Sequence, residues 1–95
     1  MIALSLYGCN GGIGGVRRQT TCYGIGSSIV IDAGTGLATL SIDQMAKIDH
    51  VVLTHAHLDH IACLPLMLDS VAGLRDNPVT VWANAEVIGL LQTHV

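Results

Sequence analysis

The sequence predicts an α/β (α+β) fold, a sheet with helices on at least one face. Three observations support this prediction. Of the 95 residues, 51% are apolar, which is enough for one hydrophobic core. Short β-capable apolar runs fill the amino-terminal third of the chain. Helical and strand patterns then alternate, which is the order found where helices pack on a sheet.

The amino-terminal third is predicted to hold three strands. The runs 2–7 and 20–25 are short and apolar, and 27–32 reads SSIVID before the turn AGTG at 33–36. Between the first two runs lies GCNGGIGG, residues 8–15, with five glycines in eight positions. Glycine weakens any regular element that it interrupts, so this segment is predicted to be a loop.

In the middle of the chain, helix and strand signals alternate. Ser41 with Gln44 three places later is typical of a capping box and predicts a helix over 42–48. The run HVVLT at 50–54 predicts a buried strand. Pro65 rules out one continuous helix from 59 onward, so we expect a single turn near 59–63 and a helix that starts at residue 64 or 65.

Turn-forming residues divide the last third of the chain. Gly73 is expected to end the preceding helix, and 76–78 reads Asp-Asn-Pro, a turn. A strand over 79–82 follows, and Asn84 is expected to cap a final helix. That helical pattern reaches Val95 without a stop signal, which suggests a chain that is cut rather than finished.

Composition argues against two kinds of partner. Four Lys and Arg stand against seven Asp and Glu, a net charge of −3, so binding to nucleic acid through a basic patch is not expected. The longest apolar run, 61–68, contains a proline and is far shorter than the roughly 20 residues that cross a bilayer. The three cysteines are widely spaced and do not suggest a disulfide framework, so a reducing cytoplasm is the expected compartment.

Three of the five histidines fall in THAHLDHI, residues 54–61. His55 and His57 would project to the same side of an extended segment, so they can hold one ion. Asp59 and His60 are adjacent and can face a second ion in the turn that follows. Imidazole and carboxylate are the usual nitrogen and oxygen ligands of zinc. Crowding these groups without a cation would leave polar groups unsatisfied, so a metal site is predicted at the end of the strand.

The run HAHLDH at 55–60 resembles the His-x-His-x-Asp-His signature of the metallo-β-lactamase superfamily. Asp32-Ala33-Gly34 is similar to the Asp-x-Gly turn that follows an early strand in that superfamily. Leu58 within the motif, Ile61 after it and the glycine-rich loop 8–15 further resemble the class II cyclic-nucleotide phosphodiesterases and their bacterial relatives. Those proteins are much longer.

The resemblance implies that residues 1–95 form the amino-terminal half of an αββα sandwich, with a mixed sheet and helices on one face. The domain would be incomplete, with its carboxyl-terminal half absent. The resemblance also implies that His55 and His57 bind a first zinc ion and that Asp59 and His60 bind a second. Asp59 would also help to orient the attacking hydroxide, and Asp32 would hold a ligand or the turn in place. The complete site would contain two zinc ions, although manganese or iron would also suit these ligands.

The implied activity is metal-dependent hydrolysis of phosphodiesters by a zinc-activated hydroxide. A small phosphodiester, above all a 3′,5′-cyclic nucleotide, is the implied substrate. The family's remaining ligands lie downstream, so the 95-residue chain is expected to show little or no turnover alone. Lactamases and thiolesterases commonly have Gly-Gly or Gly-Leu after the motif, whereas this chain has Ala62-Cys63, which argues against those two activities. An arylsulfatase, an RNA-processing nuclease, a thiolester hydrolase and a non-catalytic metal-binding fragment remain alternatives.

Other residues carry weaker signals. The loop glycines Gly11, Gly12 and Gly14 could cradle a substrate phosphate through backbone N–H groups, or could serve only as a tight connection. Missing partner strands would leave an exposed apolar edge, so the chain is expected to self-associate. The remaining residues of note are expected to be structural or solvated; they are Arg17, Arg18, His50 with Asp49 as its expected partner, Cys63 in the core, and His94.

Overall fold

The computed structural model of the chain describes residues 4–9, 20–55 and 57–94. Within these residues the chain forms one five-stranded sheet in the order β1-β2-β3-β4-β5. The first three strands pair antiparallel, and β3, β4 and β5 pair parallel, so the predicted mixed sheet is confirmed. The strands are β1 (Leu4–Gly8), β2 (Cys22–Ile25), β3 (Ile29–Ile31), β4 (His50–Val52) and β5 (Thr80–Trp82).

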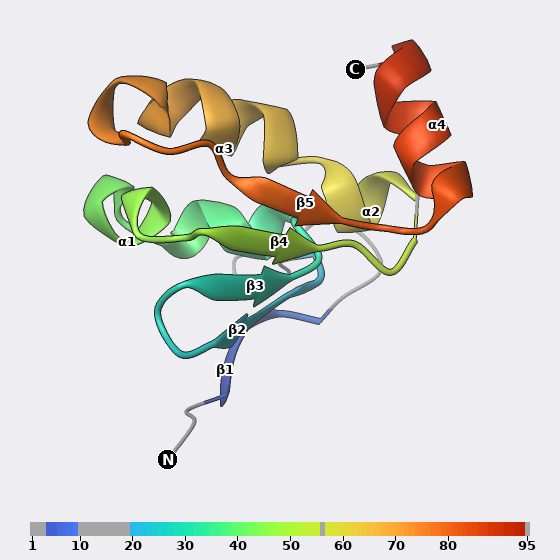
Figure 1. Cartoon of the computed structure of the whole chain (residues 1–95). Coiled ribbons are helices and arrows are strands. Elements are labelled where there is room, and N and C mark those ends of the chain that lie inside the picture. Colours follow the sequence, from blue (N-terminus) through green and yellow to red (C-terminus); the bar gives the residue numbers. More distant parts are fainter. Residues whose placement is uncertain (1–3, 10–19, 56, 95) are drawn as a thin grey trace.

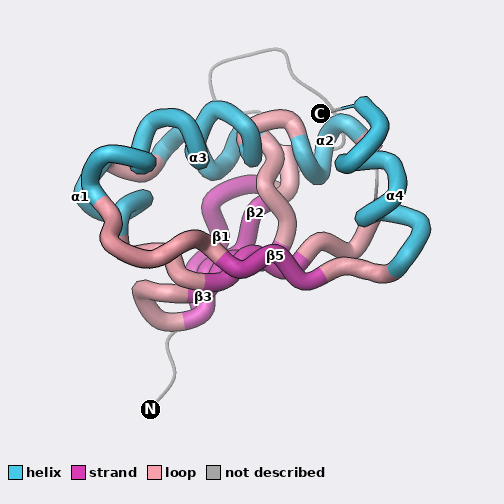
Figure 2. Tube along the Cα trace, turned by 45° about the horizontal axis from the view of Figure 1, so that its top comes forward, coloured by secondary structure: helices cyan, strands magenta, loops and turns pink. Residues whose placement is uncertain are grey.

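The described helices are α1 (Ile42–Ala46), α2 (Leu58–Ile61), α3 (Leu64–Val71) and α4 (Ala85–His94), with 3₁₀ turns η1 (Thr35–Thr39) and η2 (Ala72–Leu74). In both views α1, α2 and α3 lie on the same side of the sheet, and α4 follows the carboxyl end of β5 (Figures 1 and 2). Helices on one face are therefore confirmed. None of the helices in the described ranges is long and apolar enough to cross a membrane.

Three predicted helix starts are confirmed by their hydrogen bonds. The Ser41 hydroxyl accepts the backbone N–H of Gln44 at 3.1 Å, and the Gln44 side chain accepts the backbone N–H of Ser41 at 2.8 Å, which completes the capping box. Pro65 stands in the first turn of α3, where its missing N–H costs no hydrogen bond. The side chain of Asn84 accepts the N–H of Val87 at 2.9 Å at the start of α4.

Two predicted turn signals lie in 3₁₀ segments. The turn predicted at 33–36 leads into the 3₁₀ turn η1, in which the hydroxyl of Thr39 donates to the carbonyl of Gly36 at 2.7 Å. Helix α3 ends at Val71 with Ala72 as its C-cap, so Gly73 stands directly after the cap, as predicted, and the 3₁₀ turn η2 continues to Leu74 before Arg75 becomes extended (φ −124°, ψ 140°).

The contacts of Arg75 correct the expected partner of His50. Its guanidinium donates to the carbonyl oxygens of Ala46 and Ile48 at 2.9 and 2.8 Å and contacts the Asp49 carboxylate at 2.9 Å. Asp49 is therefore engaged by Arg75 and does not satisfy His50. Instead, Nδ1 of His50 accepts the indole N–H of Trp82 at 3.1 Å, across the pairing of β4 with β5.

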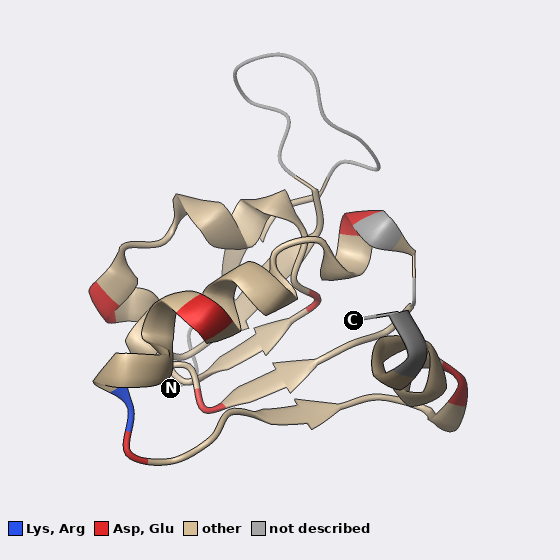
Figure 3. Cartoon of the chain, turned by 90° about the horizontal axis from the view of Figure 1, so that it is seen from above, with Lys and Arg blue, Asp and Glu red and all other residues tan. Residues whose placement is uncertain are grey.

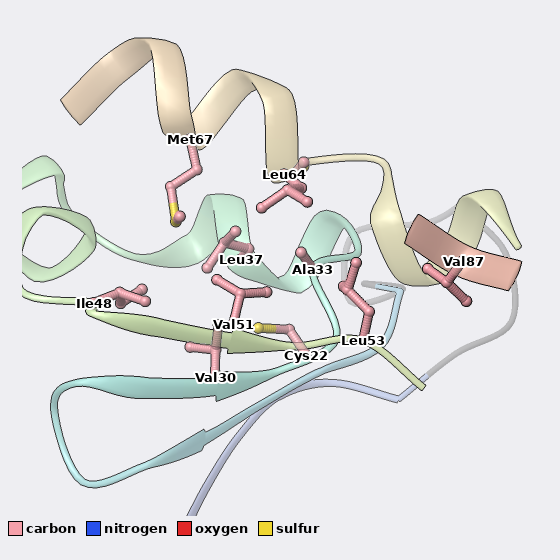
Figure 4. Packing of buried hydrophobic residues seen from close by; sticks show 11 residues of the cluster. Cys22, Val30, Ala33, Leu37, Ile48, Val51, Leu53, Leu64, Met67 and Val87 are labelled. Carbon is pink, nitrogen blue, oxygen red and sulfur yellow. The ribbon is translucent and has the colours of Figure 1, made fainter. Parts of the chain in front are cut away.

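The core lies between the sheet and the elements above it (Figure 4). Val30 and Val51 point up from β3 and β4 toward Leu37 of η1 and Met67 of α3 (Figure 4). Burial raises the pKa of the Cys22 thiol to about 12 and also raises the pKa of Cys63, so both thiols stay neutral at neutral pH. Cys63 is confirmed as a core residue, since it lies in the buried cluster at 9% exposure.

The other face of the sheet carries exposed apolar side chains. Strand register places Leu6, Tyr23, Ile31, Val52 and Trp82 in one row across the five strands. Leu6 is 59% exposed and Trp82 is 56% exposed. The sequence predicted exposed apolar surface along a sheet edge, and the structure shows it across a sheet face. Self-association of the chain stays a prediction.

Candidate metal centre

The predicted ligands lie where the parallel strands end. The N–H of Asp32, after β3, donates to the carbonyl of Val52 at 2.7 Å, and the N–H of Leu53, after β4, donates to the carbonyl of Trp82 at 2.8 Å. These bonds align the carboxyl ends of β3, β4 and β5 at one edge of the sheet, where α2 follows (Figure 1). Sites in α/β sheets usually form at this edge.

The Asp32–Gly34 turn packs against α2 through backbone contacts. The N–H of Ala33 donates to the carbonyl of His60 at 2.6 Å, and the N–H of Cys63 donates to the carbonyl of Ala33 at 2.8 Å. Asp32 adopts φ 63°, a left-handed conformation that aspartate tolerates better than most residues. A Cβ atom on Gly34 would overlap the carbonyl oxygen of Asp59, so only glycine allows this approach.

The structure brings the predicted ligands together. The ring centroids of His55 and His57 are 5.7 Å apart with planes 17° apart, and those of His55 and His60 are 4.9 Å apart. Nε2 of His60 lies 3.4 Å from Oδ2 of Asp59. Among the described residues, no group of three His, Cys, Asp or Glu side chains is arranged to hold one ion. The four donors therefore lie near one another through the contacts His55–His57, His55–His60 and Asp59–His60.

Asp32 lies beneath these donors and is 3% exposed. Its two oxygens accept the N–H of Thr54 at 2.8 Å and the hydroxyl of Thr54 at 2.7 Å. Nδ1 of His60 lies 2.8 Å from Oδ2 of Asp32, although this buried nitrogen makes no hydrogen bond of normal geometry in the described structure. Asp32 thus touches one predicted ligand directly.

Sequence reasoning noted that Thr54 fits the signature before the first histidine but assigned it no role in the site. Its hydroxyl lies 2.9 Å from Nδ1 of His55 and also contacts Asp32, so it connects two predicted functional residues. A hydroxyl directly before the first histidine of the cluster was the available signal. Its role depends on Asp32, which is 22 residues away in sequence, so spacing within 54–61 could not reveal it.

The donor set fits a divalent cation. His55, His57 and His60 offer imidazole nitrogens, Asp59 offers carboxylate oxygens, and neutral imidazole with carboxylate is the usual ligand set of zinc and similar ions. In addition, Nδ1 of His60 and Nδ1 of His55 both lie near groups that can orient the rings, an arrangement typical of metal-binding histidines.

Several weaker predictions fall elsewhere. Gly11, Gly12, Gly14, Arg17 and Arg18 lie outside the described residues, as does the side chain of His94. A cavity of about 280 Å³ is lined by Ser27, Ile29, Gln44, Lys47 and Ile48, among others. It lies at the amino ends of β3 and β4, at the edge opposite the histidines, and is not part of this site.

Comparison with known proteins supports this assignment of the fold and motif. A family model described as "Beta-lactamase superfamily domain" matches residues 27–95. A Ribonuclease Z of Clostridium beijerinckii is 33% identical over 88 residues, covering 85% of this chain and 29% of the relative. A metallo-beta-lactamase fold-containing protein of Sulfurisphaera tokodaii is 42% identical over 41 residues, covering 43% of this chain and 16% of the relative.

A solved structure shows the same fold. The metallo-beta-lactamase fold protein YhfI of Bacillus subtilis superposes with a TM-score of 0.77 and 22% identity, covering 99% of this chain and 42% of YhfI. The chain therefore spans less than half the length of this neighbour and less than a third of its curated relatives. Because the family model matches most of its length, the chain belongs to the metallo-β-lactamase superfamily.

Proposed function

We propose that the complete protein, of which this chain would be the amino-terminal part, is a metal-dependent hydrolase of phosphodiesters with 3′,5′-cyclic nucleotides as its first candidate substrates. The observation that carries the proposal is the group of three histidines and one aspartate at the carboxyl edge of the sheet. Membership of the superfamily supports it, because the family generally binds divalent metals and contains many hydrolases. Ribonuclease Z, which one relative is named for, also acts on phosphodiesters.

In this proposal the donors divide into two pairs. His55 and His57, whose rings stack, would hold one zinc ion, and Asp59 and His60, whose polar atoms are 3.4 Å apart, would hold the other. Manganese or iron would also suit these donors. When bound, the ions would supply Lewis acidity and a water whose pKa is about 7.

The protein's own groups would orient the reaction. Asp59 can direct a carboxylate oxygen toward the attacking water. Asp32 can hold the ring of His60 in place through the contact of its Oδ2 with Nδ1. A catalytic zinc site usually takes three ligands from the protein, whereas each pair supplies two. The chain alone is therefore expected to turn over substrate slowly or not at all.

RNA is a second candidate substrate, favoured by the similarity to a Ribonuclease Z over 85% of the chain. The scarcity of free basic side chains favours a cyclic nucleotide over RNA as the substrate. Viewed from above, the charged segments of the cartoon are few and mostly acidic (Figure 3). Of the described basic side chains, Arg75 is engaged by backbone carbonyls and Asp49, and Lys47 stands at the opposite edge from the histidines.

We also propose a cytoplasmic location. The exposed Cys9 and the buried Cys22 and Cys63 are all free thiols. Free thiols persist in a reducing compartment.

The test is a hydrolysis assay on the full-length protein loaded with zinc, using cyclic nucleotides, a chromogenic phosphodiester and a short RNA. We expect the triple variant His55→Ala, His57→Ala, Asp59→Ala to lose more than about 100-fold in kcat/KM, since losing an outer-shell partner alone costs 10- to 100-fold. The matched control, His50→Ala, changes a histidine that pairs with Trp82 outside the cluster and should keep activity. Unchanged hydrolysis in the triple variant would refute the proposal, and cleavage of RNA alone would favour the nuclease.

A further inference from the structure

We propose that Thr54 is a positioning residue that fixes the tautomer of His55, with the proton on Nδ1 and the lone pair on Nε2. This inference rests on the proposed function, because a free Nε2 matters when His55 binds a cation. It goes beyond the motif, since Thr54 is neither one of the predicted ligands nor a predicted support for them.

Thr54 is held by two hydrogen bonds to one buried side chain. Its backbone N–H donates to Oδ1 of Asp32 at 2.8 Å, and its hydroxyl donates to Oδ2 at 2.7 Å. Asp32 is 3% exposed and is itself fixed by its N–H bond to Val52. The Thr54 hydroxyl therefore has a defined orientation, although the residue is otherwise exposed.

Counting the protons in these contacts then assigns the tautomer of the neighbouring His55 ring. A threonine hydroxyl has one hydrogen, and that hydrogen is used in the bond to the Asp32 carboxylate. The same oxygen lies 2.9 Å from Nδ1 of His55, so in this contact it can only accept. Nδ1 must then carry the proton. A neutral imidazole has one protonated nitrogen, so Nε2 keeps its lone pair for a ligand.

Asp32 reaches His60 as well, at 2.8 Å from Nδ1 to Oδ2. One buried carboxylate thus lies behind a histidine of each proposed pair. It acts on His60 by direct contact and on His55 through the Thr54 hydroxyl. Removing that hydroxyl should release His55 while leaving His60 in contact with Asp32.

The tautomer can be read in the metal-free chain by NMR of ¹⁵N-labelled histidine at about pH 8, where an ordinary histidine is neutral. We expect His55 to be protonated on Nδ1 in the wild type and in Thr54→Ser, which keeps the hydroxyl. In Thr54→Val, which has the same shape without it, Nε2 should become substantially protonated. Zinc affinity measured by titration should fall about 10-fold in Thr54→Val and recover in Thr54→Ser.

Protonation of Nε2 in the wild type, or an unchanged tautomer in Thr54→Val with a native backbone spectrum, would overturn the inference. The wild-type reading decides even if the valine variant does not fold. If no zinc binds to any form, the proposed function fails, while the tautomer measurement still tests Thr54 independently.

Discussion

Replacing Gly34 with alanine is expected to destabilise the fold by about 3 kcal/mol and to separate α2 from the turn beneath it. A Cβ atom at this position would overlap the carbonyl oxygen of Asp59 and the hydroxyl of Thr20 and would lie 2.8 Å from the backbone carbon of Thr20. Two of these three atoms belong to the backbone and cannot rotate away. Gly34 has φ −75°, which alanine adopts freely, so the effect is steric rather than conformational.

Urea denaturation of the Gly34→Ala and Gly73→Ala variants measures this effect. Gly73 is the matched control, because a Cβ added there meets no atom within 4 Å. It should leave stability unchanged or raise it by up to about 1 kcal/mol, since alanine is the better helix former. If Gly34→Ala proves as stable as the wild type, the turn and α2 cannot pack as closely as described.

Changing Asp32 to asparagine is expected to weaken zinc binding by about 10- to 100-fold and to lower the free energy of unfolding by about 1–2 kcal/mol. The amide oxygen can still accept the N–H of Thr54, but the amide nitrogen cannot replace the charged oxygen shared by the Thr54 hydroxyl and His60. Asparagine also tolerates the positive φ of this position, so the backbone should not move.

Asp43→Asn provides the control for charge loss, because Asp43 is an exposed residue in the first turn of α1. It should cost less than about 0.5 kcal/mol and leave zinc binding unchanged. Calorimetric titration with zinc and urea denaturation give both quantities on the same samples. An Asp32→Asn variant that binds zinc as tightly as the wild type would show that Asp32 does not support the ligands.

Much of the fold could be predicted because its signals are local. The capping box at Ser41, Pro65 at the start of α3 and Asn84 at the start of α4 each act within one helical turn, and each was found where expected. The missed features depend on distant pairs. Arg75 binds carbonyls 27 and 29 residues away, and Trp82 pairs with His50 across two strands whose register the sequence does not state.

The candidate site shows the same division. Motif spacing placed His55, His57, Asp59 and His60 in one neighbourhood, because all four lie within six positions. The part played by Thr54 required knowing that residues after β3 and β4 meet at one edge of the sheet. That meeting depends on the parallel pairing of the two strands, which no local pattern in 54–61 contains.

The central claim is that the side chains at the ends of these strands bind divalent cations, and zinc titration of the purified metal-free chain tests it most directly. We predict saturable zinc binding by the wild type and by His50→Ala, with at least about 100-fold weaker binding by the triple variant His55→Ala, His57→Ala, Asp59→Ala, which removes donors from both pairs. A wild-type chain that takes up no zinc, or a triple variant that binds it equally well, would contradict the claim.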